Sequence, residues 1–542
     1  MSPYGYCSIN SLPGFMPRRN LLIPTLCIVL LVTIWTFRFP DPSSYPSLEW
    51  LEAAGRSHLP SSLKSSSPNN VADDSTTTTS TSTTTTTASA THSADGPALA
   101  TWSPPQAPLY PQISSASPVI PGNEIDLSQP DAPFVGWPLQ RVCDEATWVD
   151  GLVFICDNNS GGIGNIRNYI QTCLRYALEA GATGLVIPKI RKRSEEDIAD
   201  LFTDYLPFSY MFDEKRFRDA FGDNCPQITL YDDIKDIPGV NVVGGKGKGK
   251  GKKSKDKDKS KGAGEGYEDI EPKIDTIAPK DFGNREGCDW QDQNRHTDRF
   301  GDTFRKWLSD EEHGHPPSKA KPRLVRFKWG VLWDWQIYRD GPEFAASFGG
   351  ILKFNDKLLR LGKKTLERMH AFARADGVAD GSFLGIHLRS ESDALGFWPS
   401  YDMQSDAYIE QAQKRGFQTA YLATGNLTEA DKFIDGAIEM AQMKIVTKAD
   451  LLSGPDLDEL EELSWDQQGL VDHVVLLGAK FFVGTMPSSF SVYMAMKRHL
   501  KTGGLYTRPY KVGTEGDGYS FLVGNYERYW QGWLFMFDGM WP

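Results

Sequence analysis

The segment FLGIHLRSESD, residues 383–393, brings a histidine and an arginine to the end of a short apolar run. Phe383 to His387 has the composition of a buried strand, so His387 and Arg389 leave its carboxyl end. A guanidinium held away from water is costly without an anion beside it. We therefore expect Arg389 either to pair with an internal carboxylate or to bind an anionic ligand.

Two further segments could donate hydrogen bonds to an anion. The loop NNSGGIGN follows a predicted strand, Leu152 to Ile155, and opens a predicted helix, Ile166 to Ala180, so its amides could surround a phosphate. The loop TMPSS precedes another predicted helix and offers the hydroxyls of Ser488 and Ser489. Each segment also has a plain structural interpretation, because glycines make turns and serines cap helices.

Alternating strand and helix patterns place these loops in two α/β halves. The first half continues with a strand at Gly184 to Ile187, a strand at Arg323 to Trp333 and helices within Ala346 to Arg374. After Gly381 the pattern restarts, with strands at Phe383 to His387, Thr419 to Thr424, Lys444 to Val446 and Phe481 to Gly484, and helices from Gln467 to Ala479 and from Phe490. We predict an α/β fold of two Rossmann-like domains with a ligand crevice between them.

The N-terminus carries a targeting signal. Arg18 and Arg19 precede the apolar stretch Leu21 to Phe37, which as a helix would span about 25 Å. No small-residue cleavage site follows closely, so we predict an uncleaved transmembrane anchor over residues 20–38, with the 1–19 tail cytosolic and the rest luminal. A buried core helix is the alternative. The single-pass type II topology predicts a Golgi or endoplasmic reticulum membrane protein.

Two low-complexity stretches flank or interrupt the head. Residues 39–132 are rich in Ser, Thr and Pro and predict a disordered, O-glycosylated stem. The Lys/Gly run 244–266 predicts a solvated loop inside the first domain, with an acidic partner site as the alternative. The formal net charge of -12 gives no general basic surface, so nucleic acid is not expected as a partner.

Five of the seven cysteines would be luminal. Cys143, Cys225 and Cys288 lie in loop-like sequence and are the better candidates for disulfides, although the connectivity stays open. Cys156 ends a predicted strand and Cys173 lies on the apolar face of a predicted helix, so we expect both to be buried thiols. No cysteine pair has the spacing of a zinc site.

Taken together, these residues resemble the GDP-fucose protein O-fucosyltransferase family. The resemblance rests on the Gly-x-x-Gly-Asn turn (Gly161, Gly164 and Asn165), on HLR at 387–389, on YLATGN, and on DHVVLLGAKFFVGTMPSSFS at 472–491. It implies a GT-B architecture, an inverting transfer of fucose from GDP-fucose to a glycoprotein or glycan acceptor, and no required metal. The resemblance covers about Gly151 to Leu500. From the strand and helix patterns we predict domains at 133–378 and 379–510, with an aromatic segment, 511–542, packing on the head.

The resemblance also implies roles for single residues. Arg389 would hold the donor pyrophosphate and counter the charge that develops on the departing GDP. The implied donor site consists of Gly161, Gly162, Gly164, Asn165, His387, Arg389, Ser488, Ser489 and Phe490. This chain departs from the family at Gly162 and in the SESD that follows Arg389, so the general base stays open between Glu391 and Asp393.

Three other functions compete with this one. A nicotinamide dehydrogenase would use SGGIGN and the Y-x-x-x-K of Tyr493 and Lys497, but the fingerprint is incomplete and the pair lies too late in the chain. A metal-dependent transferase would need Asp456 and Asp458, which we interpret as a solvated helix start. The serious rival is a noncatalytic luminal binding or scaffold protein that keeps the fold without its base.

Two N-glycosylation sequons fall beside the expected crevice. One begins at Asn158 in the glycine-bearing loop, and the other begins at Asn426 after a predicted strand. Because a glycan at either position would obstruct a donor site, we predict that both asparagines are largely unmodified.

Overall fold

The computed structural model describes residues 125–242, 270–282, 297–391, 398–502, 512–524, 529 and 532–542. The predicted anchor (20–38), the Lys/Gly loop (244–266), Cys288 and Asp393 lie outside these residues. The end of the predicted stem lies inside them and is folded, because Leu127 and Ser128 are buried. The head therefore begins by residue 125 rather than at 133. No helix in the described ranges is both long and apolar enough to cross a membrane.

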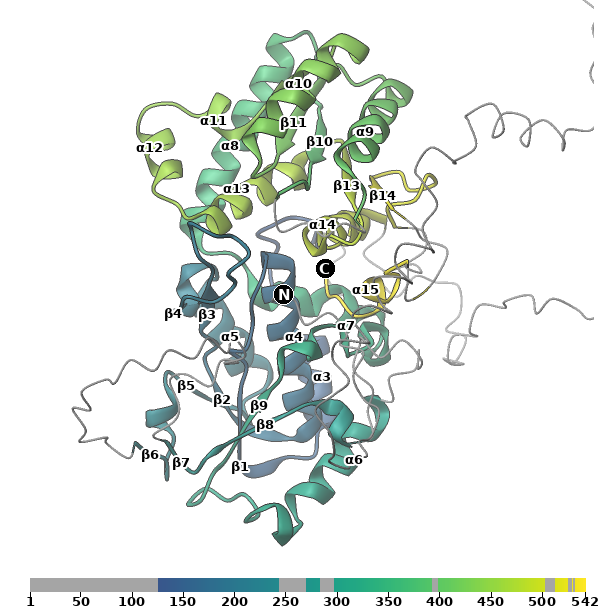
Figure 1. Ribbon diagram of the computed structural model, residues 1–542. Helices are drawn as coiled ribbons and strands as arrows, with labels where there is room; N and C mark the ends of the chain where they lie inside the picture. Colours follow the sequence, from purple (N-terminus) through teal and green to yellow (C-terminus); the bar gives the residue numbers. More distant parts are fainter. Residues whose placement is uncertain are drawn as a thin grey trace, which may run out of the picture. The chain divides into compact units, whose positions relative to one another are not determined.

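The first half of the head is built on a five-stranded parallel sheet, in the order β5-β2-β1-β9-β8 (Figure 1). Its strands are β1 (Val149–Ile155), β2 (Ala182–Val186), β5 (Thr229–Tyr231), β8 (Ile274–Ile277) and β9 (Arg323–Phe327). Two small antiparallel pairs accompany it, β3 (Ile190–Lys192) with β4 (Asp204–Leu206) and β6 (Asn241–Val242) with β7 (Ile270–Glu271).

A second five-stranded parallel sheet follows, in the order β12-β11-β10-β13-β14. Its strands are β10 (Leu384–His387), β11 (Thr419–Ala423), β12 (Lys444–Val446), β13 (Phe481–Thr485) and β14 (Ser520–Val523). Numbered in chain order, these strands lie as 3-2-1-4-5, so the order reverses beside β10. In open parallel sheets ligands bind at the carboxyl ends of the strands where the order reverses.

Helices connect and cover the strands (Figure 1). The α-helices of the first half and its boundary are α3 (Trp137–Glu145), α4 (Ile163–Ala180), α5 (Glu214–Asn224), α6 (Thr297–Leu308), α7 (Pro342–Ser347) and α8 (Asp356–Ala375). Those of the second half are α9 (Tyr401–Arg415), α10 (Leu427–Ala441), α11 (Lys448–Leu451), α12 (Pro455–Glu461), α13 (Trp465–Gly478), α14 (Ser489–His499) and α15 (Phe535–Asp538). Short 3-10 helices are η2 (Phe208–Tyr210), η3 (Ile234–Asp236), η4 (Pro279–Phe282), η5 (Glu311–His313), η6 (Trp329–Trp333), η7 (Ile337–Asp340), η8 (Phe348–Leu352) and η9 (Leu500–Thr502).

The predicted α/β class and both parallel sheets are confirmed, but three boundaries differ. The strand expected over Arg323 to Trp333 ends at Phe327, opposite the last residue of its neighbour β8, and η6 follows. Helix α4 begins at Ile163, three residues before the predicted start, so Asn165 lies in its first turn. The C-terminal segment does more than pack on the head, since β14 completes the second sheet.

Helix α8 lies just before the expected domain boundary at residue 378 and packs on α13 of the second half. A β-carbon at Gly362 would lie 2.6 Å from Cβ of Val474, so the two helices are in close contact. The C-terminal end is also buried, because Trp541 is fully covered and its carbonyl accepts a hydrogen bond from Arg167. One large hydrophobic cluster includes residues of α4, α8, α13, α14 and this C-terminal segment.

The cysteine predictions are half right. Cys143 and Cys225 form a disulfide that joins α3 to the end of α5. Cys156 and Cys173, expected as separate buried thiols, also form one, with a Cα separation of 5.7 Å. Periodicity placed each correctly in the core, at the end of β1 and inside α4, but it could not show that α4 folds back to bring the two sulfurs together.

Candidate active site

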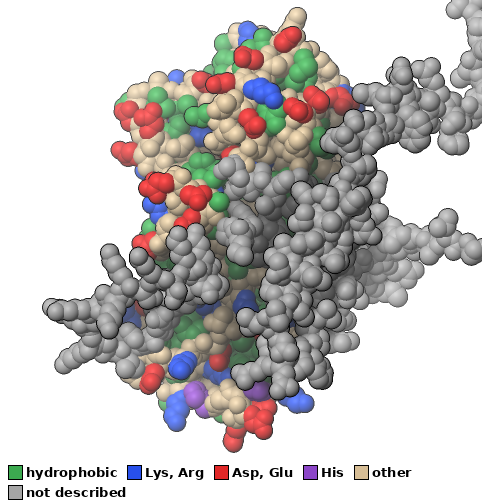
Figure 2. Space-filling view, viewed as in Figure 1, with side chains coloured by type: hydrophobic (Ala, Val, Ile, Leu, Met, Phe, Trp, Pro, Cys, Tyr) green, Lys and Arg blue, Asp and Glu red, His purple; other side chains and the backbone are tan. Residues whose placement is uncertain are grey.

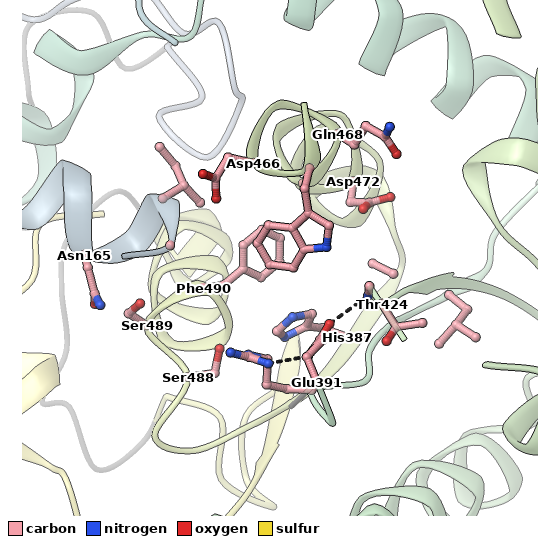
Figure 3. A pocket seen from close by; sticks show the side chains of 18 of the residues that line it. Asn165, His387, Glu391, Thr424, Asp466, Gln468, Asp472, Ser488, Ser489 and Phe490 are labelled. Carbon is pink, nitrogen blue, oxygen red and sulfur yellow. Dashed lines mark hydrogen bonds and ion pairs between the residues drawn. The ribbon is translucent and has the colours of Figure 1, made fainter. Parts of the chain in front are cut away.

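A cavity of about 440 Å³ lies where loops of both halves meet. Eight of the predicted site residues line it: Gly162, Asn165, His387, Arg389, Glu391, Ser488, Ser489 and Phe490. Figure 3 shows Asn165, Ser489, Phe490 and His387 around this space. Gly161 and Gly164 lie in the adjoining turn and helix without lining it, and Asp393 lies outside the described residues. The expected convergence of the three loops is therefore observed.

The end of β10 is held by helix α9. The amide of Arg389 donates to Oε1 of Gln404 at 3.0 Å, and Nε2 of Gln404 donates to the carbonyl of Arg389 at 2.9 Å. The hydroxyl of Tyr408 donates to the carbonyl of His387 at 3.0 Å. Gln404 and Tyr408 are fully buried, so they fix the backbone from which both side chains project.

His387 is a buried, neutral ring. Its Nδ1 lies 2.7 Å from Oγ of Ser491, which accepts the Thr485 amide, and its ring packs on Phe490 with a centroid separation of 4.5 Å. Burial, helped by the positive charge of Arg389, lowers the pKa of His387 to about 4, although Glu391 opposes the shift. His387 can therefore donate or accept one hydrogen bond at neutral pH but carries no charge.

Arg389 has an internal partner and also faces the cavity. Its Nη1 donates to Oε2 of Glu391, and its guanidinium lies 5.3 Å from the ring of Trp398. The sequence posed these as alternatives, an internal carboxylate or an external anion. A guanidinium carries five N–H donors, so an ion pair through Nη1 is compatible with an anion in the cavity.

Glu391 is tied down by several donors. Besides Arg389, the amide of Gly425 donates to its Oε1 at 2.7 Å and the amide of Ser390 donates to its Oε2 at 3.1 Å. Burial alone would raise its pKa, but the charge of Arg389 and these hydrogen bonds hold the pKa of Glu391 below its usual value. A carboxylate so stabilised is a weak proton acceptor, and its geometry suits the holding of Arg389.

Two helix N-termini meet at the cavity. Helix α4 begins after Gly162 with no side-chain cap, and α14 begins after Ser488, whose hydroxyl accepts the Ser491 amide. Gly164 permits the meeting, because a β-carbon there would lie 2.6 Å from the carbonyl carbon of Ser489. Helix N-termini present free amides and partial positive charge, so together they favour an anion between them.

Asn165 and Gly162 shape the α4 side of the site. The carboxamide oxygen of Asn165 is buried without a hydrogen-bond partner, although the residue lines the cavity. A buried acceptor without a partner is costly and points to a donor group that binds there. At Gly162 an added β-carbon would meet nothing within 4 Å, so the glycine leaves open space at the start of α4.

Several lining residues escaped the sequence analysis. Arg193 forms an ion pair with Asp466 across the two halves at 3.3 Å, and both side chains are buried. Asp472 accepts from Tyr421 at 2.6 Å and from Lys448 at 2.9 Å. Asp472 is the first residue of the DHVVLLG segment that carries part of the family resemblance, so the sequence did offer a reason to consider it as a site residue. Arg193 had none, because it lies in the β3–β4 region far from any motif.

Tryptophans form much of the remaining wall: Trp329, Trp333, Trp398, Trp465 and Trp533. Trp533 has a φ of 60°, a left-handed conformation that is rare for a bulky side chain. Such strain persists only where surrounding contacts impose it, and it concentrates at functional sites. The aromatic C-terminal segment thus supplies one wall of the cavity.

Among the described residues, no group of three or more His, Cys, Asp or Glu side chains could hold a metal ion. Asp456 and Asp458 lie in the first turn of α12, as expected of a helix start, and Asp456 pairs with Lys364 at 2.6 Å. The face shown in Figure 2 carries acidic side chains over the second half.

Two parallel α/β sheets meet at a cavity where Arg389 and two helix N-termini favour an anionic ligand. The family model described as GDP-fucose protein O-fucosyltransferase matches residues 152–501, so the chain belongs to this family. No curated protein matches the chain.

Solved structures of fucosyltransferases match much of the chain at low identity. POFUT1 in complex with GDP is 13% identical with a TM-score of 0.38, covering 70% of this chain and 100% of that one. A mutant of Arabidopsis thaliana FUT1 with GDP is 12% identical with a TM-score of 0.31, covering 66% and 71%. NodZ from Bradyrhizobium is 13% identical with a TM-score of 0.32, covering 64% and 92%.

Proposed function

We propose that this protein is a glycosyltransferase of GT-B type that transfers fucose from GDP-fucose, with inversion and without a metal, to a hydroxyl of a glycoprotein or glycan. The family match supports the donor. The observation that carries the proposal is the convergence of Arg389 and the N-termini of α4 and α14 on one cavity. The N-terminal apolar stretch supports a type II anchor in the Golgi or endoplasmic reticulum membrane.

The site would act on the leaving group. As the bond between fucose and phosphate breaks, negative charge grows on GDP, and Arg389 with the amides and hydroxyls of Ser488 and Ser489 would stabilise it where it develops. Such fixed donors supply the positive charge that a divalent cation supplies elsewhere. Neutral His387 and the carboxamide of Asn165 would orient the donor sugar and phosphates across the cleft.

Glu391 and Asp393 stay the candidate bases for the acceptor hydroxyl. The three hydrogen bonds on Glu391 favour a positioning role for it, since they hold the guanidinium of Arg389 at the cavity. The same observation supports the second candidate function, a noncatalytic scaffold that binds the nucleotide sugar without transferring it. The two functions differ in turnover rather than in binding.

The test uses purified full-length protein in detergent. We expect GDP-fucose to bind and GDP to be released in the presence of glycoprotein or sugar acceptors, with no loss of rate after chelation of divalent cations. The Arg389→Ala variant should lower turnover by about 10²–10³-fold, while Arg360→Ala, which removes an exposed arginine paired with Glu459, should change nothing. Binding without transfer to any acceptor would favour the scaffold, and absence of binding would reject both functions.

A further inference from the structure

A second, much smaller cavity lies behind the donor site and collects positive charge. Its volume is about 20 Å³, enough for one water molecule or one monatomic ion and too small for a phosphate. Polar side chains from three helices line it: Arg167 of α4, His473 of α13, and Tyr493 and Lys497 of α14. The Y-x-x-x-K pair of the sequence thus faces this cavity rather than a nicotinamide.

Arg167 and Lys497 are buried without a carboxylate partner. They are 2% and 7% exposed, and no Asp or Glu side chain lines the cavity that they share. Arg167 donates only to backbone carbonyls, those of Trp541 at 3.2 Å and Gly349 at 2.6 Å, and its Nε has no partner. Two buried positive charges side by side are costly unless a negative charge accompanies them.

No aspartate or glutamate is among the residues that line the cavity. The nearest negative charges lie outside the lining: Asp126 acts electrostatically on Lys497, and the terminal residue Pro542 lies against Gly349 close to Nη2 of Arg167. Lys353, which also lines the cavity, is neutralised by Asp213 at 3.0 Å. Within its lining, the cavity thus holds Arg167 and Lys497 with no carboxylate side chain between them.

His473 adds an unused donor. Both of its ring nitrogens are buried without hydrogen-bond partners, and the ring stacks on Tyr493 at 4.7 Å. Burial, with the charges of Arg167 and Lys497, lowers the pKa of His473 well below its usual value, so the ring is neutral and carries one N–H. A buried donor without an acceptor carries a free-energy penalty that an anion would remove.

We propose that this cavity is a binding site for a monatomic anion of the size of chloride, held by Lys497, Arg167 and His473. The ion would neutralise the two buried cations and accept the hydrogen bond of the histidine. Burial and Arg167 lower the pKa of Lys497 to about 7, which is consistent with a site that lacks a protein counter-charge. The bound anion would keep Lys497 protonated.

The anion would stabilise the junction of α4 with α13 and α14. The guanidinium of Arg167 lies 4.1 Å from the ring centroid of Tyr493, so the cavity wall joins the first half to the second. His473 also contacts Phe490 at 5.8 Å, which in turn packs on His387 in the donor site. Anion binding in this cavity is measured by the thermal stability of the protein and is therefore independent of fucose transfer.

The test measures the thermal unfolding midpoint of the full-length protein at pH 7 while chloride replaces gluconate at constant ionic strength. We expect the midpoint to rise by about 2 °C as chloride fills the site. In the Lys497→Met variant the response to chloride should disappear. The matched control Lys480→Met, which removes an exposed lysine outside the cavity, should keep it.

A crystallographic measurement on the unaltered protein makes the test independent of how the variant folds. Crystals soaked in bromide should show an anomalous peak between Lys497, Arg167 and His473. The proposal is overturned by any of three results: a wild-type unfolding midpoint that does not change with chloride, a chloride response that is retained in Lys497→Met, or a bromide map without this peak. Water would then be the occupant of the cavity.

Discussion

Gly164 and Ser489 are in contact across the two halves of the head, since a β-carbon on Gly164 would lie 2.6 Å from the carbonyl carbon of Ser489. The contact sets two helix N-termini side by side at the rim of the cavity, as Figure 3 shows for Asn165 and Ser489. The position of the anion-binding amides thus depends on the absence of one side chain.

Replacing Gly164 with alanine should separate α4 from α14. Because the obstructing atoms are backbone, the helix must shift, and a displacement near 1 Å at a reacting centre lowers turnover by about 10²-fold. Fucose transfer and GDP affinity measure the effect. The control is Gly222→Ala in α5, where the added methyl group meets nothing within 4 Å. Unchanged turnover in Gly164→Ala would show that the helices need not touch.

The Glu391→Gln variant separates positioning from base catalysis. If Glu391 positions Arg389, loss of its charge should weaken GDP binding, by roughly 10-fold for a charged hydrogen bond. If it is the base, turnover should fall while GDP affinity stays constant. Calorimetric titration with GDP and steady-state kinetics distinguish these outcomes, with exposed Glu462→Gln as control.

The neutral state of His387 makes stability depend on pH. Its pKa falls from 6.5 to about 4 on folding, so between these values the unfolded chain binds a proton that the folded protein does not. Stability is therefore greatest above pH 6.5 and declines as pH falls toward 4, by about 3 kcal/mol from this residue.

Urea unfolding of wild type and His387→Gln at pH 7 and pH 4.5 measures this contribution. The difference between the two proteins should shrink at the lower pH, because the variant lacks the titrating ring. His315→Gln, at an exposed position, serves as the control. An equal difference at both pH values would contradict a depressed pKa for His387.

The two sequons should carry no glycan. Nδ2 of Asn158, the atom that would be modified, donates to the carbonyl of Phe327 at 3.0 Å. Nδ2 of Asn426 donates to the carbonyl of Ser390 at 3.3 Å while its Oδ1 accepts the Glu429 amide. Glycopeptide mass spectrometry of protein from secretory cells tests this, and a mature glycan on Asn158 would count against the donor site.

The disulfides predict the result of peptide mapping without reduction. We expect linked peptides that contain Cys156 with Cys173 and Cys143 with Cys225. Replacing both Cys156 and Cys173 with alanine should lower the free energy of unfolding by about 3 kcal/mol. Their bond joins residues 17 positions apart, and closing a loop of about 15 residues restricts the unfolded chain by about that amount. Recovery of Cys156 as a free thiol would contradict the structure.

Local patterns in the sequence predicted much of the fold and most of the site. The helical spacing in α4 and the apolar runs of β1, β10 and β13 identify elements because side chains report which face is buried. The loops after these strands were expected to meet, because parallel strands share a carboxyl edge. Residues at those loops therefore reach the cavity as predicted.

Partners distant in sequence could not be predicted in this way. The sequence placed Cys156 and Cys173 in the core but could not show their bond. It also could not bring Arg193 to Asp466. Even Glu391, two residues from Arg389, could not be chosen as its partner, because local spacing does not show how the two side chains turn.

The sequence by itself determined which groups are present and which element carries each, because periodicity and turn chemistry act over a few residues. Only the tertiary structure decided which charges meet. Contacts such as Gly164 with Ser489, or Arg167 with Tyr493, join residues more than 300 positions apart, and they form through close packing of whole helices. The donor cavity and the cationic cavity behind it are both products of that packing.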